Sequence, residues 1–402
     1  MGTLSRVGRW LRGRYGSVAV VTGAAVLLTA CGNGMGQNAD DIVIGLVASE
    51  TGALAATAKG LPELAQGWAS WVNQTQGGIN GRHVKVIVAD DGSSAATGIS
   101  RVRRLVNKDR VIALVGNFSS VSDGAEPILA QRKIPSMTAI PNTPKWTQSP
   151  VFIPLSRTPP NSVIAKAMTA EASGAKKWAG LICAESPACD VTNVWSTVSP
   201  KLGLDYFGSI KVAAGAPSYA AQCLAFKQAG VDYVQLGLPM MVTTRVIRDC
   251  QQQGYQPKYG IDTLAWDPAL LSIPGLQVFG DSYTLPWFAD HPALDEYKKL
   301  ENTYVSQESW RRFTSIASFA ALEVFRKAMT QADAEPTAAG VLAAMAALHD
   351  ENLGGLLPNT LGGFNAGKGP QPALNCYFAA GIDDGEYVIP DDIRPLCVDV
   401  TV

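Results

Sequence analysis

Short apolar runs alternate with helical patterns along most of this 402-residue chain. Ile42 to Val47 has the length and composition of a buried strand, and Pro62 to Asn73 follows as a helix with a proline near its start. The same rhythm continues, with further strands expected at 84–89, 111–116 and 135–140 and a helix at 97–108. Alternating strands and helices form parallel sheets covered by helices, so the sequence predicts an α/β fold.

Three prolines between residues 154 and 160 interrupt this alternation, which then begins again. The restart marks a second lobe with its own core. In it we expect strands at 178–184, 210–212, 233–238 and 258–263 and helices at 219–229 and 242–253. Beyond Gly280 we expect a strand at 282–285, helices at 313–331 and 336–348, and two short β runs at 376–379 and 387–389.

The first thirty residues have the pattern of a secretory signal. Four arginines and no acidic residue accompany an apolar run from Val18 to Leu28, which is too short and wrongly flanked to span a membrane. We interpret residues 1–30 as the signal and 31–40 as a flexible tether. The run ends in Leu-Thr-Ala-Cys-Gly, which resembles the bacterial lipoprotein box. Cys31 is therefore the expected lipid-attachment site, and the alternative is an ordinary export signal followed by an incidental cysteine.

The expected export and the net charge of the mature chain limit which molecules it can bind. At least two acyl chains on Cys31 would hold the protein stably on the outer face of the cytoplasmic membrane. Four of the 33 basic residues lie in the signal, which leaves 29 against 34 acidic residues, a net charge of −5. An acidic mature chain argues against nucleic acid as a partner. The expected membrane contact is thus the lipid and not a basic patch.

Seven cysteines are present. If Cys31 carries lipid, the other six form an even set in an oxidising compartment, where three disulfides are plausible. Order along the chain favours the pairs Cys183 with Cys189, Cys223 with Cys250, and Cys376 with Cys397. Buried free thiols are the alternative. No pair has C-x-x-C spacing and the histidines are not at metal-ligand spacing, so we expect no metal site.

Motifs of catalysis are missing from the sequence. It has no G-x-S-x-G, no H-E-x-x-H and no G-x-G-x-x-G after a strand. Residues 362–368 match G-x-x-x-x-G-K, but Gly369 replaces the serine or threonine that would hold magnesium, and two prolines prevent the helix that would follow. We therefore expect neither an enzyme nor a cofactor.

Several local motifs occur in a fairly specific order. They are Ile42 to Leu46 with Thr51-Gly52, the stretch from Asn73 to Gly81, Ala89-Asp90-Asp91, Val115 to Ser120, and Ile134-Pro135. In order and spacing they resemble the leucine/isoleucine/valine-binding family of ABC-transporter receptors, which have the type I periplasmic-binding fold. The resemblance covers most of the mature chain.

This resemblance implies two Rossmann-like lobes with parallel sheets, joined by a hinge of three crossovers. We place the crossovers near 152–157, 280–285 and 361–365, which gives a first lobe of 41–155 and 284–360 and a second of 156–283 and 361–402. A small polar ligand would bind in the cleft between the lobes and stabilise a closed form that the ABC-transporter permease recognises. The protein would act as a monomer.

The first-lobe site begins at Ser119 and Ser120, which follow a buried strand and precede a helix. Hydroxyls and N–H groups at a positive helix end suit a carboxylate. The alternative is simple helix capping, which we prefer for Ser122 and Asp123. In the next loop, Ile140, Asn142 and Thr143 occupy the place where the family offers a backbone N–H and a hydroxyl, with Asn142 where threonine is usual.

Two aromatic positions of the family are not aromatic here. They fall near Thr57 and Ala188, so the rings that would sandwich a small aliphatic ligand are missing and the pocket is expected to be larger. Trp266 and Met240, with the neighbouring Met241, could supply other walls, since both residue types adapt to bulky apolar surface. The alternative is that all three belong to the lobe core.

Asp262 is the sharpest candidate in the second lobe. It ends an expected strand and aligns with the family's Gly-x-Glu segment, whose carboxylate receives the ligand's amino group. Opposite Ser119 and Ser120, it would bracket a zwitterion, so an amino acid is the expected ligand. An aromatic or other carboxylic acid or amide is the alternative ligand, and Asp262 as a turn cap is the alternative role.

The sequence is compatible with three functions from different classes. A transport receptor is the one that it favours. A ligand-sensing subunit would carry its own signalling segment, and no apolar run of membrane-spanning length follows the signal. A secreted enzyme would need a convergent acid/base set, which the sequence does not show.

Overall fold

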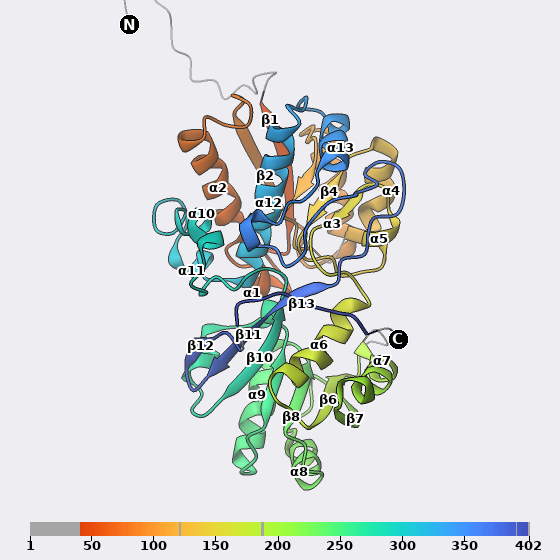
Figure 1. Ribbon diagram of the computed structural model, residues 1–402, viewed down its shortest axis with the longest axis vertical. Coiled ribbons are helices and arrows are strands. Elements are labelled where there is room, and N and C mark those ends of the chain that lie inside the picture. Colours follow the sequence, from red (N-terminus) through yellow and green to blue (C-terminus); the bar gives the residue numbers. More distant parts are fainter. Residues whose placement is uncertain (1–40, 120–121, 186–188, 391, 401–402) are drawn as a thin grey trace, which may run out of the picture. The chain divides into compact units, whose positions relative to one another are not determined.

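The computed structural model describes residues 41–119, 122–185, 189–390 and 392–400. They form two sheets, each covered by helices (Figure 1). We call the five-stranded sheet with its helices the first lobe and the larger sheet with its helices the second lobe. The predicted two-lobed α/β fold is confirmed.

The sheet of the first lobe is parallel throughout, in the order β2-β1-β3-β4-β5. Its strands are β1 Ile42–Ala48, β2 Val84–Asp90, β3 Leu114–Val115, β4 Ser136–Thr138 and β5 Phe152–Pro154. Every residue of β1 is buried, as expected for a strand covered on both faces.

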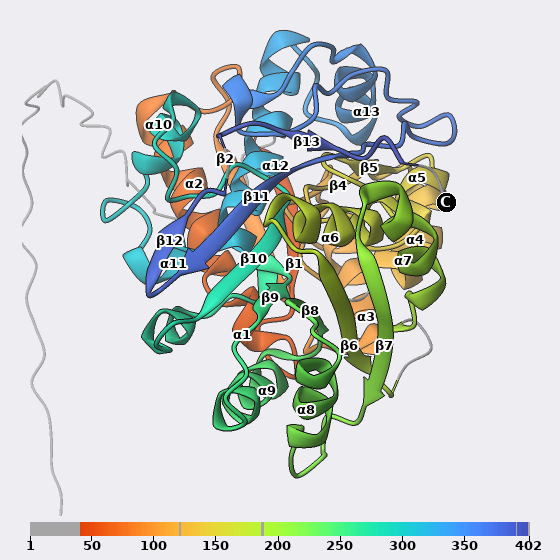
Figure 2. The same ribbon diagram turned by 60° about the horizontal axis from the view of Figure 1, so that its bottom comes forward.

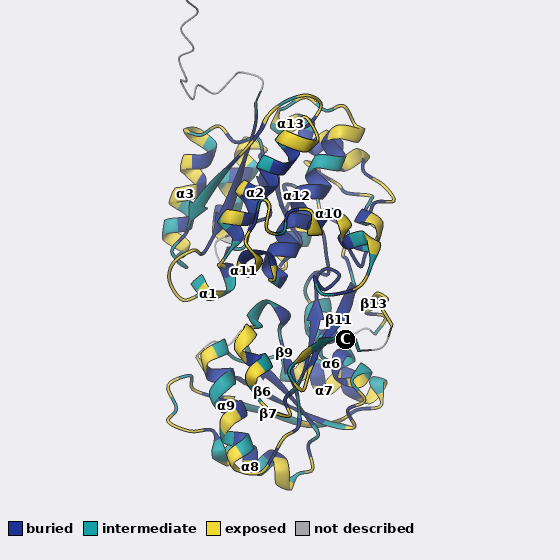
Figure 3. Cartoon of the chain, turned by 90° about the vertical axis from the view of Figure 1, so that its left-hand side faces the viewer, coloured by how far each residue is buried: buried dark blue, intermediate teal, exposed yellow. Residues whose placement is uncertain are grey.

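Helices from two separate stretches of the chain cover this sheet. They are α1 Ala55–Ala58, α2 Leu61–Thr75, α3 Ala95–Asn107, α4 Ser122–Arg132 and α5 Lys145–Gln148, followed much later by α10 Asp295–Lys298, α11 Gln307–Trp310, α12 Phe313–Gln331 and α13 Ala338–Ala347. Most of α12 is buried (Figure 3). Its Glu323 accepts a 2.7 Å hydrogen bond from the fully buried Trp68 of α2, which satisfies the indole N–H inside the core.

The second sheet has the order β12-β11-β10-β9-β8-β6-β7, with β13 paired to β11. Its strands are β6 Lys177–Cys183, β7 Asp205–Val212, β8 Tyr233–Gly237, β9 Lys258–Ile261, β10 Gln277–Ser282, β11 Cys376–Asp383, β12 Glu386–Val388 and β13 Leu396–Cys397. The strands from β6 to β10 are parallel, whereas the C-terminal β11 is antiparallel to β10, β12 and β13 (Figure 2).

Helices and several short turns complete the described part of the second lobe. The helices are α6 Asn161–Ala172, α7 Thr192–Val198, α8 Ala220–Gln228 and α9 Met240–Gln252. Single 3-10 turns lie at Ser199–Leu202, Thr263–Ala265 and Pro268–Ser272 in this lobe and at Pro292–Leu294 and Leu353–Gly355 in the first.

The strand expected at 282–285 lies earlier in the chain, at 277–282. Gly280, beyond which that strand was expected, is inside β10. A Cβ there would press against the carbonyl of Ile261 on the neighbouring β9. The glycine therefore permits close approach of two strands and does not end one.

Three segments connect the lobes, and hydrogen bonds hold them together. In the first, Ser156 donates from its hydroxyl to the carbonyl of Tyr283 in the second at 2.9 Å. Thr158 donates from its backbone N–H to Leu374 in the third at 3.0 Å. The third lies later than the expected 361–365, because residues 367–371 still hydrogen-bond to the 147–150 stretch of the first lobe.

The three disulfides are those that chain order favoured: Cys183–Cys189, Cys223–Cys250 and Cys376–Cys397. This prediction is confirmed. The second joins α8 to α9, and the third joins β11 to β13. Among the described residues no helix combines the length and apolar character needed to cross a membrane, and no group of side chains is suited to hold a metal ion.

Candidate functional site

A cavity of about 590 Å³ lies at the carboxyl ends of the second lobe's strands. Ile182, Leu236 and Ile261, at or near the ends of β6, β8 and β9, reach it. In open parallel sheets, ligands bind at this edge. We call it the second-lobe cavity; its other lining residues include Val163, Lys166, Glu185, Val191, Trp195, Gln235, Pro239, Asp262 and Ala265.

Lys166 and Asp262 bring charges of both signs to this cavity. The Nζ of Lys166, on α6, lies 3.2 Å from a carboxylate oxygen of Asp262 and 3.2 Å from one of Asp281. The Asp262 side chain is 36% exposed and that of Lys166 18%, so both retain some contact with solvent. An anion could thus approach the lysine and a cation the aspartate.

Asp281 links this pair to the first crossover. Arg157, whose side chain is fully buried, forms an ion pair with Asp281, and its guanidinium carbon lies 3.8 Å from the centroid of the Tyr283 ring. The four charged groups, Arg157, Asp281, Lys166 and Asp262, form a neutral set that runs from the crossovers to the cavity. Buried charges need such pairing because desolvation of an isolated charge is costly.

The pKa values of this set follow from burial and pairing. Burial alone would raise the pKa of Asp262, but the charges of Lys166 and Arg157 outweigh it and lower that pKa. Burial would likewise lower the pKa of Lys166, but Asp262 and Asp281 raise it above its ordinary value. Both groups are therefore ionised at neutral pH.

Asp262 has two roles at once. One carboxylate oxygen accepts the backbone N–H of Leu264 at 3.1 Å and caps the turn that follows β9, and the other faces Lys166. The cap and the binding role were alternatives from the sequence alone, and the geometry leaves room for both. Lys166 was not identified from the sequence, where the available signal was a lone lysine between Ala165 and Ala167 in an otherwise largely apolar helix.

The other second-lobe candidates lie elsewhere. Met240 begins α9 and packs, half-buried, against the lobe core without lining the cavity. Its neighbour Met241 is 81% exposed. Trp266 also packs against that core, donates from its indole N–H to Ile261 at 3.2 Å, and reaches a different cavity.

In the first lobe, internal hydrogen bonds hold two of the candidate positions. The hydroxyl of Ser119 donates to the buried carboxylate of Asp91 at 2.6 Å, so its proton is directed into the lobe. In the loop where the resemblance implies a backbone N–H for the ligand, the N–H of Ile140 donates to the Thr138 hydroxyl at 3.1 Å. Ser120 and Ala188 lie outside the described residues, as does Cys31.

The remaining first-lobe candidates are more accessible. Asn142 is exposed, and Thr143 is half-buried just before α5. Thr57 is half-buried, and its carbonyl accepts a 3.0 Å hydrogen bond from the hydroxyl of Thr314. Their contact with a ligand stays a prediction.

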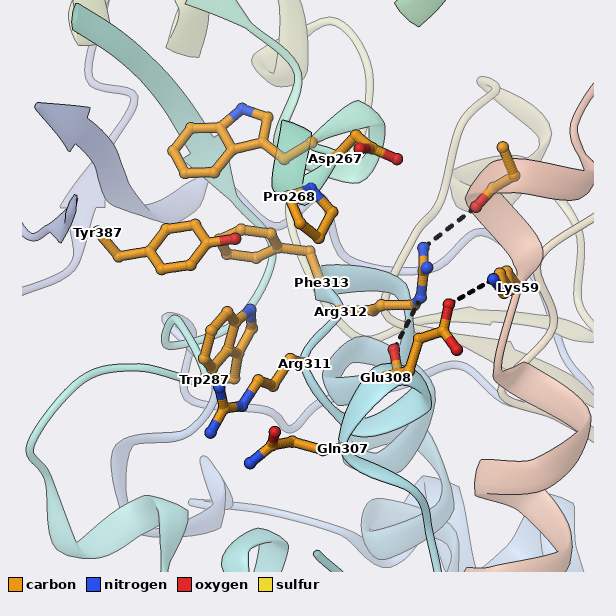
Figure 4. A pocket seen from close by; sticks show the side chains of 12 residues that line it. Lys59, Asp267, Pro268, Trp287, Gln307, Glu308, Arg311, Arg312, Phe313 and Tyr387 are labelled. Atoms are coloured by element: carbon orange, nitrogen blue, oxygen red, sulfur yellow. Dashed lines mark hydrogen bonds and ion pairs between the residues drawn. The ribbon is translucent and has the colours of Figure 1, made fainter. Parts of the chain in front are cut away.

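A second cavity, of about 500 Å³, is lined by residues of both lobes, and we call it the interlobe cavity. It shares no lining residue with the second-lobe cavity, although the chain passes from one to the other between Ala265 and Trp266. Its lining residues are Ala56, Lys59, Trp266, Asp267, Pro268, Trp287, Gln307, Glu308, Arg311, Arg312, Phe313 and Tyr387 (Figure 4).

Known proteins with similar sequences are periplasmic binding proteins. A family model described as periplasmic binding protein matches residues 41–386. An amino acid binding protein of Pseudomonas aeruginosa is 25% identical over 226 residues, which are 55% of this chain and 60% of that protein. The matched region thus spans less than two thirds of that relative.

Solved structures share the fold. A branched-chain amino acid ABC transporter structure from Thermus thermophilus with bound valine has a TM-score of 0.72 at 15% identity, over 89% of this chain and 97% of that one. A solute-binding protein of an ABC transporter from Rhodopseudomonas palustris, in complex with 4-hydroxybenzoate, has a TM-score of 0.69 at 17% identity with the same coverage. At these identities the similarity extends to the fold alone.

Proposed function

The chain belongs to the periplasmic binding protein family, and on this premise we propose that it is the extracytoplasmic receptor of an ABC importer. Proteins of this family are solute receptors and not enzymes, as the missing catalytic motifs predicted. In our proposal the protein is anchored through Cys31, binds a small solute between its lobes by hinge closure, and presents the closed form to a permease.

The observation that carries the proposal is the second-lobe cavity with Lys166 and Asp262 at its wall. It lies at the strand ends where open α/β sheets bind ligands, and the crossovers that would bend on closure are tied to it through Asp281. A ligand that contacts Lys166 or Asp262 would therefore alter the same set of ion pairs that includes Arg157 in the first crossover.

An amino acid is the ligand class that we favour. Its carboxylate would accept a charge-assisted hydrogen bond from Lys166, and its ammonium group would donate one to Asp262. This arrangement differs from the one expected from the sequence, in which Ser119 and Ser120 would hold the carboxylate, because the Ser119 hydroxyl donates to Asp91.

An aromatic carboxylic acid is the second candidate. Trp195, Val163 and Ile182 give the second-lobe cavity apolar walls, and the sequence has no aromatic residue at Thr57 to narrow the cleft. Such a ligand would use Lys166 but would have no group for Asp262. The two classes therefore differ in their dependence on this aspartate.

A thermal-shift panel of amino acids, amides and aromatic acids identifies the class, since a bound ligand raises the melting temperature. Calorimetry then compares wild type with Asp262→Asn. For an amine-bearing ligand, loss of a charge-assisted bond of about 1.5–3 kcal/mol weakens binding about ten- to a hundredfold. A plain carboxylic acid should bind with unchanged or higher affinity, because Lys166 loses a competing partner.

Asp205→Asn is the matched control, since Asp205 is an exposed acid of the second lobe that lines neither cavity. If no amine-bearing compound binds the wild type, the amino-acid assignment fails. If no compound of any class in the panel binds, the receptor proposal itself is contradicted.

A further inference from the structure

The Cys183–Cys189 disulfide lies in the wall of the second-lobe cavity. Among the described cysteines, only these two line that cavity. Both are half-buried, so a small thiol can reach the bridge from solvent. The cysteines of the Cys223–Cys250 bridge, in contrast, are each only 1% exposed. The bridge at the cavity is therefore the more accessible of the two to thiol–disulfide exchange.

This bridge tethers a segment that forms part of the cavity wall. Cys183 ends β6, and Cys189 lies shortly before the start of α7. Val191 and Trp195, which follow Cys189, line the same cavity. The disulfide thus fixes the point at which the chain enters α7 relative to the end of β6.

The two halves of α7 are held in different ways. Trp195 is buried and donates from its indole N–H to the carbonyl of Val163 at 3.0 Å, which holds the second half of the helix against α6. The N-cap position is Val191, whose side chain has no hydrogen-bonding group. Close by, Asp190 and Lys211 form an exposed ion pair at 2.8 Å, and such pairs contribute little. The covalent bridge is therefore the strongest tether of the first turn.

We propose that Cys183–Cys189 is a reducible bridge whose redox state controls this wall of the second-lobe cavity. The reductant is an extracytoplasmic dithiol. One of its thiolates attacks a sulfur of the bridge, so that the S–S bond breaks, one cysteine is released and a mixed disulfide forms. The second thiolate then attacks the mixed disulfide and releases the other cysteine. In total the bridge takes up two electrons and two protons and becomes two thiols, while the dithiol becomes a disulfide.

Reduction frees the first turn of α7. A wall that must be ordered when a solute binds lowers the affinity for that solute, because the ordering costs free energy. This consequence rests on the proposed receptor function, whereas the reducibility of the bridge and the loosening of the wall do not. Both can be measured without a solute.

Graded reduction of the purified full-length protein with dithiothreitol tests the accessibility of the bridge. Free thiols are alkylated with iodoacetamide and located by peptide mass spectrometry. We expect Cys183–Cys189 to be half-reduced at a lower concentration than Cys223–Cys250, by about tenfold. Half-reduction of Cys223–Cys250 at the same or a lower concentration would overturn the proposal.

Hydrogen exchange of the protein without added solute tests the effect on the wall. The backbone N–H groups of Val194 and Trp195 donate to the carbonyl of Val191 in the first turn of α7. In the double variant Cys183→Ser/Cys189→Ser we expect these two amides to exchange about tenfold faster than in the wild type, because the turn opens more often.

Cys376→Ser/Cys397→Ser is the matched control. It also removes a disulfide with an accessible cysteine, but neither residue lines the second-lobe cavity, so exchange in α7 should stay as in the wild type. Melting curves verify folding, and wild type reduced and alkylated at Cys183 and Cys189 replaces the first variant if that variant does not fold. Unchanged exchange in α7 without the Cys183–Cys189 bridge, or equal acceleration in the control, would overturn the proposal. Neither result bears on the receptor function, since no solute is present.

Discussion

Lys166 and Arg157 carry the positive charge of a partly buried set whose negative members are Asp262 and Asp281. Burial penalises every one of these charges, so each is stable in the fold only through its partners. Asp281 pairs with both cations. A change in the charge of Lys166 therefore affects the ion pair at the crossovers as well as the second-lobe cavity. Single substitutions here should therefore change both stability and ligand binding.

The pH dependence of stability should report the ion pairs of Lys166. Its folded-state pKa lies above the ordinary value of 10.5. The stability that its charge contributes is thus fully present below pH 10.5 and is lost as the pH rises through the folded-state pKa. We expect Lys166→Met to lower the unfolding free energy by up to about 3 kcal/mol at pH 8 and by less at pH 11. Urea unfolding of both proteins measures this difference, and a difference that stays constant with pH would contradict the ion-pair account.

Cys31 allows a second test at the scale of one residue. We expect Cys31→Ala to abolish lipid incorporation and to leave the protein released or retained as precursor, because no other residue can supply the thioether to the lipid. Metabolic labelling with a fatty-acid analogue, with the wild type as control, measures incorporation. Labelling equal to that of the wild type would refute the anchor.

Local sequence signals located only part of the candidate site. Asp262 was found because it follows a strand, and strand ends are visible in the pattern of apolar residues. Lys166 was not found, because its role depends on packing of α6 against β10, a contact between distant segments. For the same reason the sequence did not show that Asp91, after β2, accepts the hydroxyl of Ser119.

At the scale of elements, the pattern of apolar runs predicted the type of most strands and helices, but glycine and proline were weaker guides. Gly280 lies inside β10, where it permits close packing, although the strand was expected only beyond it. The expected strand at 111–116 is only two residues long as β3, and it ends where the chain turns at Gly116 with φ +74°. Such local geometry depends on neighbours that the sequence does not identify.

Gly116 gives a test at this scale, because it joins β3 to the loop that contains Ser119. A Cβ at this position would collide with the hydroxyl of Ser318 on α12, and φ is positive. Gly203 has a similar φ of +70°, but a Cβ there meets no described atom within 4 Å. We expect Gly203→Ala to cost about 1 kcal/mol of unfolding free energy and Gly116→Ala about 1–3 kcal/mol more. Equal losses in urea unfolding would show that the collision is relieved without cost.

At the scale of the whole molecule, the restart of the strand–helix rhythm after the prolines at 154–160 was enough to predict two lobes. The third crossover was harder to place. Leu361, Phe364 and Ala366 are buried in the core of the first lobe, so the chain leaves that lobe only after residue 371. The glycines and prolines of this stretch gave no apolar periodicity from which its burial could be inferred.

The central claim is that the protein is a hinged receptor whose lobes close on a small solute. Small-angle X-ray scattering of the protein, alone and saturated with the compound that gives the largest thermal shift, tests this claim most directly. The account predicts a smaller radius of gyration with the compound, because rotation at the crossovers brings the lobes together. Superimposable scattering curves at saturation would contradict it.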